Sequence, residues 1–122
     1  MQRILIFDSN RVVAKKITKV ISELVDNITI DMAENIYVLQ DRLDKNSYDL
    51  IIADVETAAD SELALEYLHA TKARVVLWTM IPDSTEKGHL SGFIDAIMLA
   101  KKPSNMSEFR KSISNIVSNT CT

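Results

Sequence analysis

Glycine, proline and cysteine are scarce in this sequence. Two glycines, two prolines and one cysteine occur among 122 residues. With glycine only at positions 88 and 92, the chain has no phosphate loop of the dinucleotide-binding or P-loop type, and no Gly-x-Ser-x-Gly turn of a hydrolase. The single cysteine, Cys121, can form no internal disulfide and no metal site with another cysteine, which favours a reducing, cytoplasmic compartment. A free-standing enzyme is therefore not expected.

The sequence also lacks a long apolar run and an excess of positive charge. No segment approaches the roughly 18 apolar residues of a membrane-spanning helix. Met1 leads directly into a strand-like segment, so no signal peptide is expected either. The net charge of −3 argues against a nucleic-acid-binding surface. With 47% hydrophobic and 25% charged residues, the composition predicts one soluble globular domain over residues 1–122.

Short apolar segments alternate with amphipathic ones along the whole chain. The predicted strands are residues 3–7, 28–32, 50–53, 74–78 and 96–100. All but the second are continuous apolar runs, typical of parallel strands buried on both faces, and the more polar second run indicates an edge strand. The predicted helices, each following a strand, are residues 10–25, 35–43, 61–70, 84–92 and 105–117. This alternation predicts an α/β fold with a five-stranded parallel sheet and right-handed crossovers.

Polar residues follow the buried strands, at the edge of the sheet where ligands bind in open α/β folds. They are Asp8 after the first strand, Asp54 after the third, Thr79 after the fourth, and Lys101, Lys102 and Pro103 after the fifth. Neighbouring carboxylates repel each other unless a cation neutralises them, and Mg²⁺ is the usual cation at such a site. A lysine and a hydroxyl nearby can hold a phosphoryl group, which an aspartate can accept as nucleophile.

These segments, in this order, resemble the receiver domain of response regulators in two-component signalling. The stretches RILIFDSN, DLIIAD, VVLWT and LAKKP carry the resemblance, which covers the whole chain. It implies a flavodoxin-like (βα)5 sandwich with strand order 2-1-3-4-5. It also implies a phosphoryl group transferred to Asp54 from a histidine kinase or a phosphotransfer protein. The other implied site residues are Asp8 and Glu56 with Asp54 for a weakly held Mg²⁺, Thr79 and Lys102 for phosphate, and Pro103 after a cis peptide bond.

Four features of the site depart from the family pattern. Ser9 stands where the family has a second acid, which predicts weak Mg²⁺ binding. Glu56 could compensate in part, although the family mainly uses the backbone carbonyl at that position. Met80 is large where the family has a small residue, and Leu99 has no ring where the family often has an aromatic residue that moves with the threonine. The loop after Asp54 lacks the usual proline and glycine.

Two functions remain open from the sequence. In the first, Asp54 is phosphorylated in a weak, Mg²⁺-dependent reaction and the domain passes on a conformational signal. In the second, a pseudo-receiver binds a protein or a second copy without phosphorylation, and Asp54, Thr79 and Lys102 form a structural ion-pair cluster. Simpler interpretations also stay open: Asp8 as a helix N-cap, Thr79 as a turn residue, and Lys101 with Lys102 as a solvated pair.

The resemblance also predicts how the signal leaves the domain. It implies a bacterial pathway in which residues of about 84–117 bind an output protein or a second copy, without direct contact to nucleic acid or membrane. No DNA-binding helix-turn-helix follows in the sequence, so a single-domain regulator and a piece of a longer protein both fit. The predicted helix at 84–92 contains Gly88 and is the weakest by propensity, which suits a switch element.

Overall fold

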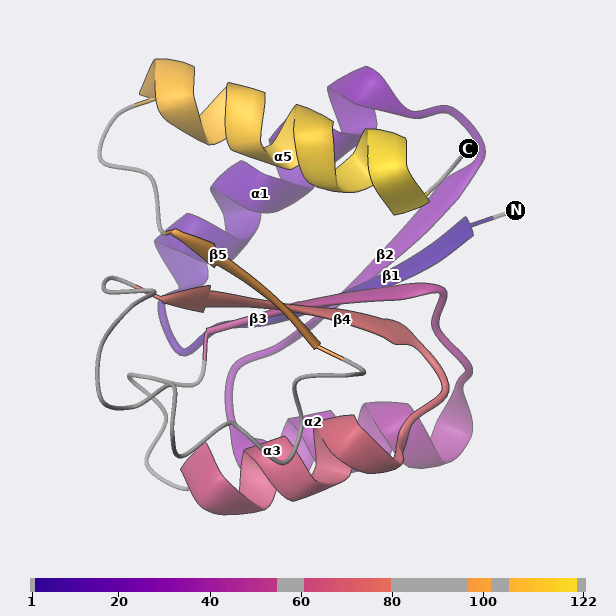
Figure 1. Cartoon of the computed structure of the whole chain (residues 1–122). Helices are drawn as coiled ribbons and strands as arrows, with labels where there is room; N and C mark the ends of the chain where they lie inside the picture. The colour runs from indigo at the N-terminus through magenta and orange to yellow at the C-terminus, as the bar shows by residue number, and fades with distance from the viewer. Residues whose placement is uncertain (1, 55–60, 80–96, 102–105, 121–122) are drawn as a thin grey trace.

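A parallel sheet lies between two layers of helices in the computed structural model of the chain, which describes residues 2–54, 61–79, 97–101 and 106–120 (Figure 1). The strands are β1 (Gln2–Phe7), β2 (Ile28–Ala33), β3 (Leu50–Ala53), β4 (Arg74–Thr79) and β5 (Ile97–Lys101). The helices of the described residues are α1 (Arg11–Leu24), α2 (Ile36–Lys45), α3 (Ser61–Ala70) and α5 (Met106–Thr120). The strand order is β2-β1-β3-β4-β5, and each neighbouring pair is parallel. The predicted fold class and strand order are confirmed.

Several element boundaries differ from the prediction by one to three residues. Thr79 and Lys101 are the last residues of β4 and β5 and not the first residues beyond them, because the ladder extends to a Thr79–Lys101 pair. Helix α5 continues to Thr120, beyond the predicted end at residue 117. The predicted helix at 84–92 lies outside the described residues.

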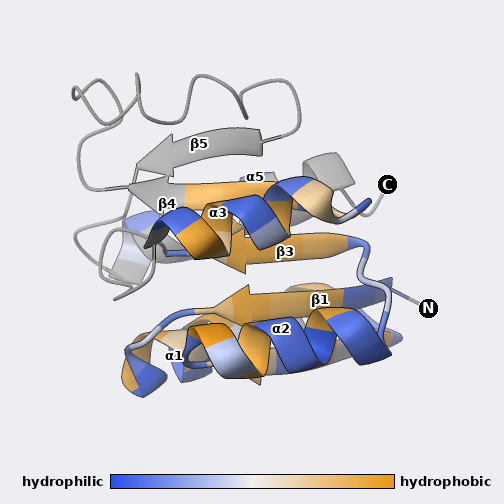
Figure 2. Ribbon diagram, turned by 90° about the horizontal axis from the view of Figure 1, so that it is seen from below, coloured by the Kyte–Doolittle hydropathy of each residue, from blue (hydrophilic) through white to orange (hydrophobic). Residues whose placement is uncertain are grey.

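Alternate residues of the central strands pack on opposite faces of the sheet. Figure 1 shows α1 and α5 on one face and α2 and α3 on the other. The core under α1 and α5 comprises Ile4, Ile6, Ala14, Ile17, Val20, Ile21, Leu50, Ile52, Val76 and Ile113. The core under α2 and α3 comprises Leu5, Phe7, Ala33, Ile36, Leu39, Tyr48, Ile51, Ala53, Ala64, Leu65, Leu68, Val75 and Leu77. Both faces of β1 and β3 are therefore covered, as their continuous apolar sequences require (Figure 2).

Strand β2 lies at the edge of the sheet, as its polar sequence predicts. Ile28 to Asp31 are half-buried and Met32 is exposed, whereas the four residues of β3 are all buried. Asparagines end the loops that lead into α1 and α2. Asn10 caps α1, since its side chain accepts hydrogen bonds from the backbone of Val12 and Val13, and Asn35 caps α2 by accepting from Val38.

A polar cluster ties β1 to β2 and β3 in the amino-terminal half of the sheet. The backbone N–H of Arg3 donates to Asp49 Oδ2 at 2.8 Å, and its guanidinium Nε meets Asp31 Oδ2 at 3.4 Å as an ion pair without hydrogen-bond geometry. The same Asp31 oxygen accepts from the Tyr48 hydroxyl at 2.7 Å, and Asn46 donates to that hydroxyl at 3.4 Å. Burial, together with the bond to the Asp31 carboxylate, raises the pKa of Tyr48 to about 12.

Candidate functional site

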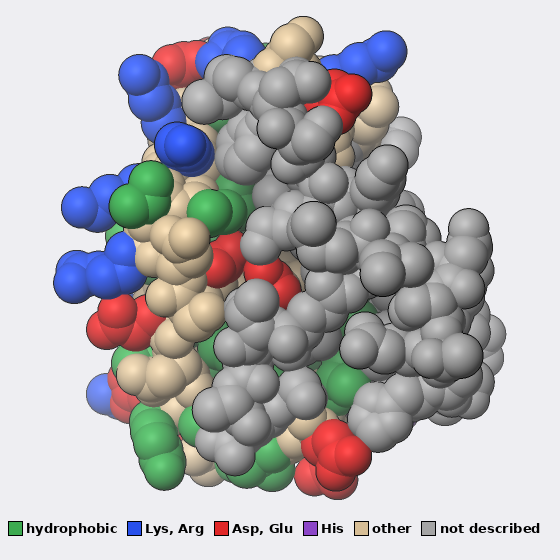
Figure 3. Space-filling view, turned by 90° about the vertical axis from the view of Figure 1, so that its left-hand side faces the viewer, with side chains coloured by type: hydrophobic (Ala, Val, Ile, Leu, Met, Phe, Trp, Pro, Cys, Tyr) green, Lys and Arg blue, Asp and Glu red, His purple; other side chains and the backbone are tan. Residues whose placement is uncertain are grey.

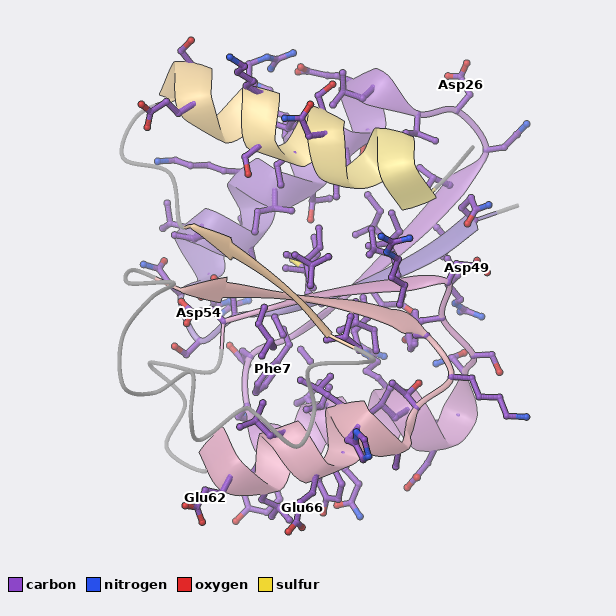
Figure 4. All side chains as sticks on the ribbon, in the orientation of Figure 1. Phe7, Asp26, Asp49, Asp54, Glu62 and Glu66 are labelled. Carbon is purple, nitrogen blue, oxygen red and sulfur yellow. The ribbon has the colours of Figure 1, made fainter. Side chains whose placement is uncertain are left out.

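Two aspartates are brought side by side at the carboxyl ends of β1 and β3. Phe7 and Ala53 are register partners in these neighbouring strands, so Asp8 and Asp54 follow at equivalent positions. The backbone N–H of Asp54 donates to Phe7 O at 2.9 Å, and that of Asp8 donates to Ala33 O at 3.0 Å. Figure 4 shows Asp54 at this end of the sheet, opposite Asp49 at the other end. The sequence prediction that the topology gathers Asp8 and Asp54 at one edge is confirmed by these positions.

Both carboxylates are buried. Asp8 is 3% exposed and Asp54 is 4% exposed, and they are the buried charged side chains of the described residues. Carboxylates are rarely buried in this way unless a neighbouring group compensates them, because removal from water destabilises the charged form. Two neighbouring acids add mutual repulsion. The arrangement favours a cation, or a group that carries one, at this edge of the sheet.

The loop after β1 fixes the orientation of Asp8. Its Oδ1 accepts a hydrogen bond from the backbone N–H of Asn10 at 2.8 Å. Asn10, and not Asp8, supplies the side chain that caps α1. The interpretation of Asp8 as the N-cap is therefore wrong, because the chain continues for two residues, Ser9 and Asn10, before the first helical residue, Arg11.

The donor set fits a weakly held Mg²⁺. Asp8 and Asp54 offer hard carboxylate oxygens at one point, and Mg²⁺ in proteins is commonly bound by one or two carboxylates with water in the other positions. Ser9 is exposed and contributes no charge where a third acid would stand. In the part of the chain that the structure describes, no group of three or more His, Cys, Asp or Glu side chains gathers at one point. Glu56, the other predicted ligand, lies outside the described residues.

The remaining predicted site residues are only partly placed. The backbone of Thr79 ends β4 beside Lys101 of β5, at the same edge as the two aspartates. Leu99 is in β5 and pairs with Leu77 of β4. Met80, Lys102 and Pro103 lie outside the described residues, as does the peptide bond that the resemblance predicts to be cis. Of the predicted output surface at 84–117, the structure describes residues 97–101 and 106–117.

Exposed apolar side chains surround this edge, and the sequence analysis did not find them. Val12 in the first turn of α1, Tyr37 in the first turn of α2 and Met32 near the end of β2 are 61%, 78% and 41% exposed. Figure 3 views this edge and shows hydrophobic, basic and acidic side chains along its left-hand margin, with further acidic ones near the centre. A signal was present, because Val12 and Tyr37 fall outside the apolar spacing that defines the buried faces of α1 and α2.

Several solved structures share this fold over nearly their whole length. The chemotaxis response regulator CheY4 of Vibrio cholerae is 16% identical, with a TM-score of 0.76 and 98% of each chain covered. The chain has the fold of a response-regulator receiver domain. The signal receiver domain of a DNA-binding response regulator (merR) from Colwellia psychrerythraea 34H is 20% identical, with a TM-score of 0.71 and coverage of 97% and 99%.

A third structure with this fold comes from an HD domain-containing protein. The signal receiver domain of an HD domain-containing protein from Pseudomonas fluorescens Pf-5 is 19% identical, with a TM-score of 0.74, and covers 98% of this chain and 97% of that one. No family model matches the sequence, and no curated protein does. None of the described helices has the length and apolar character needed to cross a membrane. The chain thus shares the receiver fold with solved structures that are 16–20% identical in sequence.

Proposed function

We propose that the chain is a two-component receiver whose phosphoryl acceptor is Asp54. One observation supports this most directly: Asp54 is a buried carboxylate at the carboxyl end of the central strand β3, directly beside Asp8. Ligands bind at this edge in open α/β sheets. Two carboxylates in register at neighbouring strand ends form an oxygen-rich site of the kind that binds a small divalent cation.

The proposed reaction is a displacement at phosphorus. A carboxylate oxygen of Asp54 attacks the phosphorus atom of a phosphohistidine, or of a small acyl phosphate. The bond from phosphorus to the donor nitrogen or oxygen breaks, the leaving group takes its electron pair, and an aspartyl phosphate forms. Water later attacks phosphorus and releases inorganic phosphate. Beyond this self-phosphorylation and self-dephosphorylation, we propose no enzymatic activity.

Charge neutralisation and positioning supply most of the catalysis in such a transfer. Asp8 and Asp54 would hold a Mg²⁺, with Glu56 as a further oxygen ligand, and the ion would neutralise negative charge on the phosphoryl oxygens. The Asp8 carboxylate is already oriented, because one of its oxygens accepts from the Asn10 amide. Thr79 and Lys102 are the proposed phosphate ligands, which their places at or directly after the neighbouring strand ends support.

The donor in this proposal is a histidine kinase or a phosphotransfer protein. The output passes to a partner, or to a second copy of the chain, through the surface formed by about residues 84–117. The solved structures with this fold include a chemotaxis regulator, a DNA-binding regulator and an HD domain-containing protein. A receiver domain can therefore serve different outputs, and the fold does not choose among them.

Intact mass spectrometry tests the proposed acceptor. The protein is incubated with acetyl phosphate and Mg²⁺ and compared with Asp54→Asn. The matched control is Asp26→Asn, because Asp26 is exposed and lies at the opposite end of the sheet (Figure 4). A single phosphoryl adduct is expected on the wild type and on Asp26→Asn, and none on Asp54→Asn. An adduct that survives in Asp54→Asn would reject Asp54 as the acceptor.

A pseudo-receiver is the second candidate, and Ser9 is the observation that favours it. This exposed serine replaces an acid that would complete the cation site. In that case the wild type gains no adduct at donor concentrations that label an ordinary receiver run in parallel. The domain would then act as a phosphorylation-independent interaction or dimerisation module.

A further inference from the structure

A groove runs along the exposed edge of β2, between α1 and α2. Its volume is about 420 Å³. Ile30, Met32 and Ala33 of β2 form its floor, Ala14 and Lys15 belong to the α1 wall, and Val38 and Arg42 belong to the α2 wall. We call this the β2 groove. Its residues include Ile30 but not Ile28, which precedes the groove on the same strand edge, and they do not include Asp54, so the inference below does not depend on phosphorylation.

Backbone groups of β2 open into this groove. In a strand, the N–H and C=O groups of successive residues point alternately to the two sides. The carbonyl of Ala33 points inward, since it accepts from Asp8 of the β1 chain, whereas the carbonyl of Met32 points outward and accepts from Arg42 Nε at 3.4 Å. Ile28 and Ile30 therefore also point outward. Neither makes a backbone hydrogen bond outside the ladder within the described part of the chain.

The acidic side chains of the β2 groove have more partners than Lys15 and Arg42 have. Among its acids, Asp31 is bound by Arg3 and Tyr48, Glu34 lies 3.7 Å from Arg11, and Asp8 accepts from a backbone amide. Two of the basic side chains form no ion pair in the described part of the chain. Arg42 bonds to a neutral carbonyl, and Lys15 takes part in no ion pair found among the described residues. The lining holds three acids and three bases, and the two bases that form no ion pair within the described residues, Lys15 and Arg42, stand on opposite walls.

Apolar side chains stand beside the groove. Met32 is part of its floor and is 41% exposed, and Val12 and Tyr37 project from the first turns of the two helices that form its walls. Exposed apolar groups gathered at one place mark interaction sites more often than singly scattered ones do. Figure 3 shows hydrophobic side chains among charged ones of both signs on its left-hand margin.

We propose that the β2 groove binds an extended, acidic segment of a partner protein, which adds to the sheet as a sixth strand beside β2. The outward N–H and C=O groups of Ile28 and Ile30 supply main-chain hydrogen bonds, which is how edge strands recognise peptides. Met32 and Val12 contact alternate apolar side chains of the segment. Lys15 and Arg42 pair with its carboxylates and select against a basic segment.

The test uses a blocked hexapeptide of alternating valine and glutamate, added to the full chain. Amide hydrogen exchange is followed by NMR. Only outward amides gain a new acceptor, so Ile28 and Ile30 should be protected at least about tenfold more with peptide, whereas Thr29 and Asp31, already turned toward β1, should change little. A hexapeptide of alternating valine and lysine should produce no such protection.

Charge reversal on the two walls provides the matched variants. Lys15→Glu with Arg42→Glu should weaken peptide binding by roughly tenfold or more, whereas Lys19→Glu, on the same exposed face of α1 but outside the groove, should leave it nearly unchanged. The proposal is overturned if the acidic peptide does not bind, if both peptides bind alike, or if odd and even amides are protected equally. Protection of Ile28 and Ile30 that grows with protein concentration alone would assign the edge to a second copy instead.

Discussion

The two ends of the sheet use their acidic residues in opposite ways. In the amino-terminal half, Asp31 meets a guanidinium and a phenol, and Asp49 accepts from the backbone of Arg3. At the carboxyl end, Asp8 and Asp54 are buried in register beside each other. Opposite charges hold strands together, whereas like charges at neighbouring positions are tolerated only for another purpose. The comparison sets carboxylates that pair with a base or a phenol beside two carboxylates that lie next to each other, where we propose the phosphoryl site.

The difference also shows in what surrounds each end. The amino-terminal cluster links β1, β2 and the segment before β3 through Arg3, Asn46 and Tyr48, so its groups restrain one another. The carboxyl end is instead bordered by exposed Val12, Met32 and Tyr37. A surface of that kind is suited to contact with another molecule.

The largest expected change in the free energy of unfolding comes from alkaline pH, which ionises Tyr48 in the amino-terminal cluster. The phenol of Tyr48 has a pKa raised from 10.0 to about 12 in the folded chain. Between these two pH values the unfolded chain binds fewer protons than the folded one, so the free energy of unfolding falls as pH rises, by about 3 kcal/mol in all. Urea unfolding at pH 9, 10 and 11 would measure this. Tyr48→Phe should remove this dependence of the free energy of unfolding on pH. Tyr37→Phe, at an exposed tyrosine, should not.

Neutralising one acid at each end should change stability in opposite directions. Asp54→Asn removes repulsion between buried carboxylates and should raise the free energy of unfolding in metal-free buffer by about 1 kcal/mol. Asp31→Asn weakens the bonds to Arg3 and Tyr48 and should lower it by about 1–2 kcal/mol. Urea denaturation at pH 7 measures both. If Asp54→Asn destabilises the chain as Asp31→Asn does, the carboxyl-end acid is structural after all.

A third acid at the carboxyl end should sharpen the contrast. Ser9→Asp adds a carboxylate next to Asp8 and should tighten Mg²⁺ binding roughly fivefold, or about 1 kcal/mol. Titration calorimetry with MgCl₂ is the measurement. Ser47→Asp is the control, because Ser47 is an exposed serine before β3, at the opposite end of the sheet. Equal affinity in the wild type and Ser9→Asp would mean that Asp8 and Asp54 form no metal pocket.

The smallest effect is expected for an exposed ion pair that belongs to neither end. Arg110 of α5 meets Glu23 of α1 at 2.7 Å, with both side chains nearly half exposed. Glu23→Gln should cost about 0.5 kcal/mol or less, and the difference should vanish in 1 M NaCl, because salt screens exposed charges. Chemical denaturation at low and high salt would measure it. A larger loss of unfolding free energy that does not depend on salt would show that this exposed ion pair stabilises the fold as much as ion pairs elsewhere in it.

The sequence was sufficient for the fold and for the two acids of the site, for a physical reason. Continuous apolar runs such as residues 50–53 can be buried only in a sheet covered on both faces, and the topology then places Asp8 and Asp54 at one edge. The cap of α1 was less certain, since both Asp8 and Asn10 are good capping residues and only the backbone path decides between them.

Other features depend on three-dimensional contacts between distant residues. The Arg3–Asp31–Tyr48 cluster joins positions that no local pattern relates. The β2 groove arises because two helices flank an edge strand, so Lys15 and Arg42 face one cavity although α1 alone predicts only a solvated basic stripe. Hydrophobic periodicity identifies what is buried, and it does not show which exposed groups meet.

The place of β1 has a consequence for how the chain reaches this structure. β1 is the first strand in sequence but lies inside the sheet, paired with β2 across 26 residues (28 − 2) and with β3 across 46 (50 − 4). Shorter loops close at lower entropic cost, so the β1–α1–β2 unit should assemble first and act as the template on which β3, β4 and β5 add in turn. Pulse-labelled exchange during refolding should then protect Ile4 before Val76. The β2 groove would thus be largely built at a stage when the Asp54 site does not yet exist.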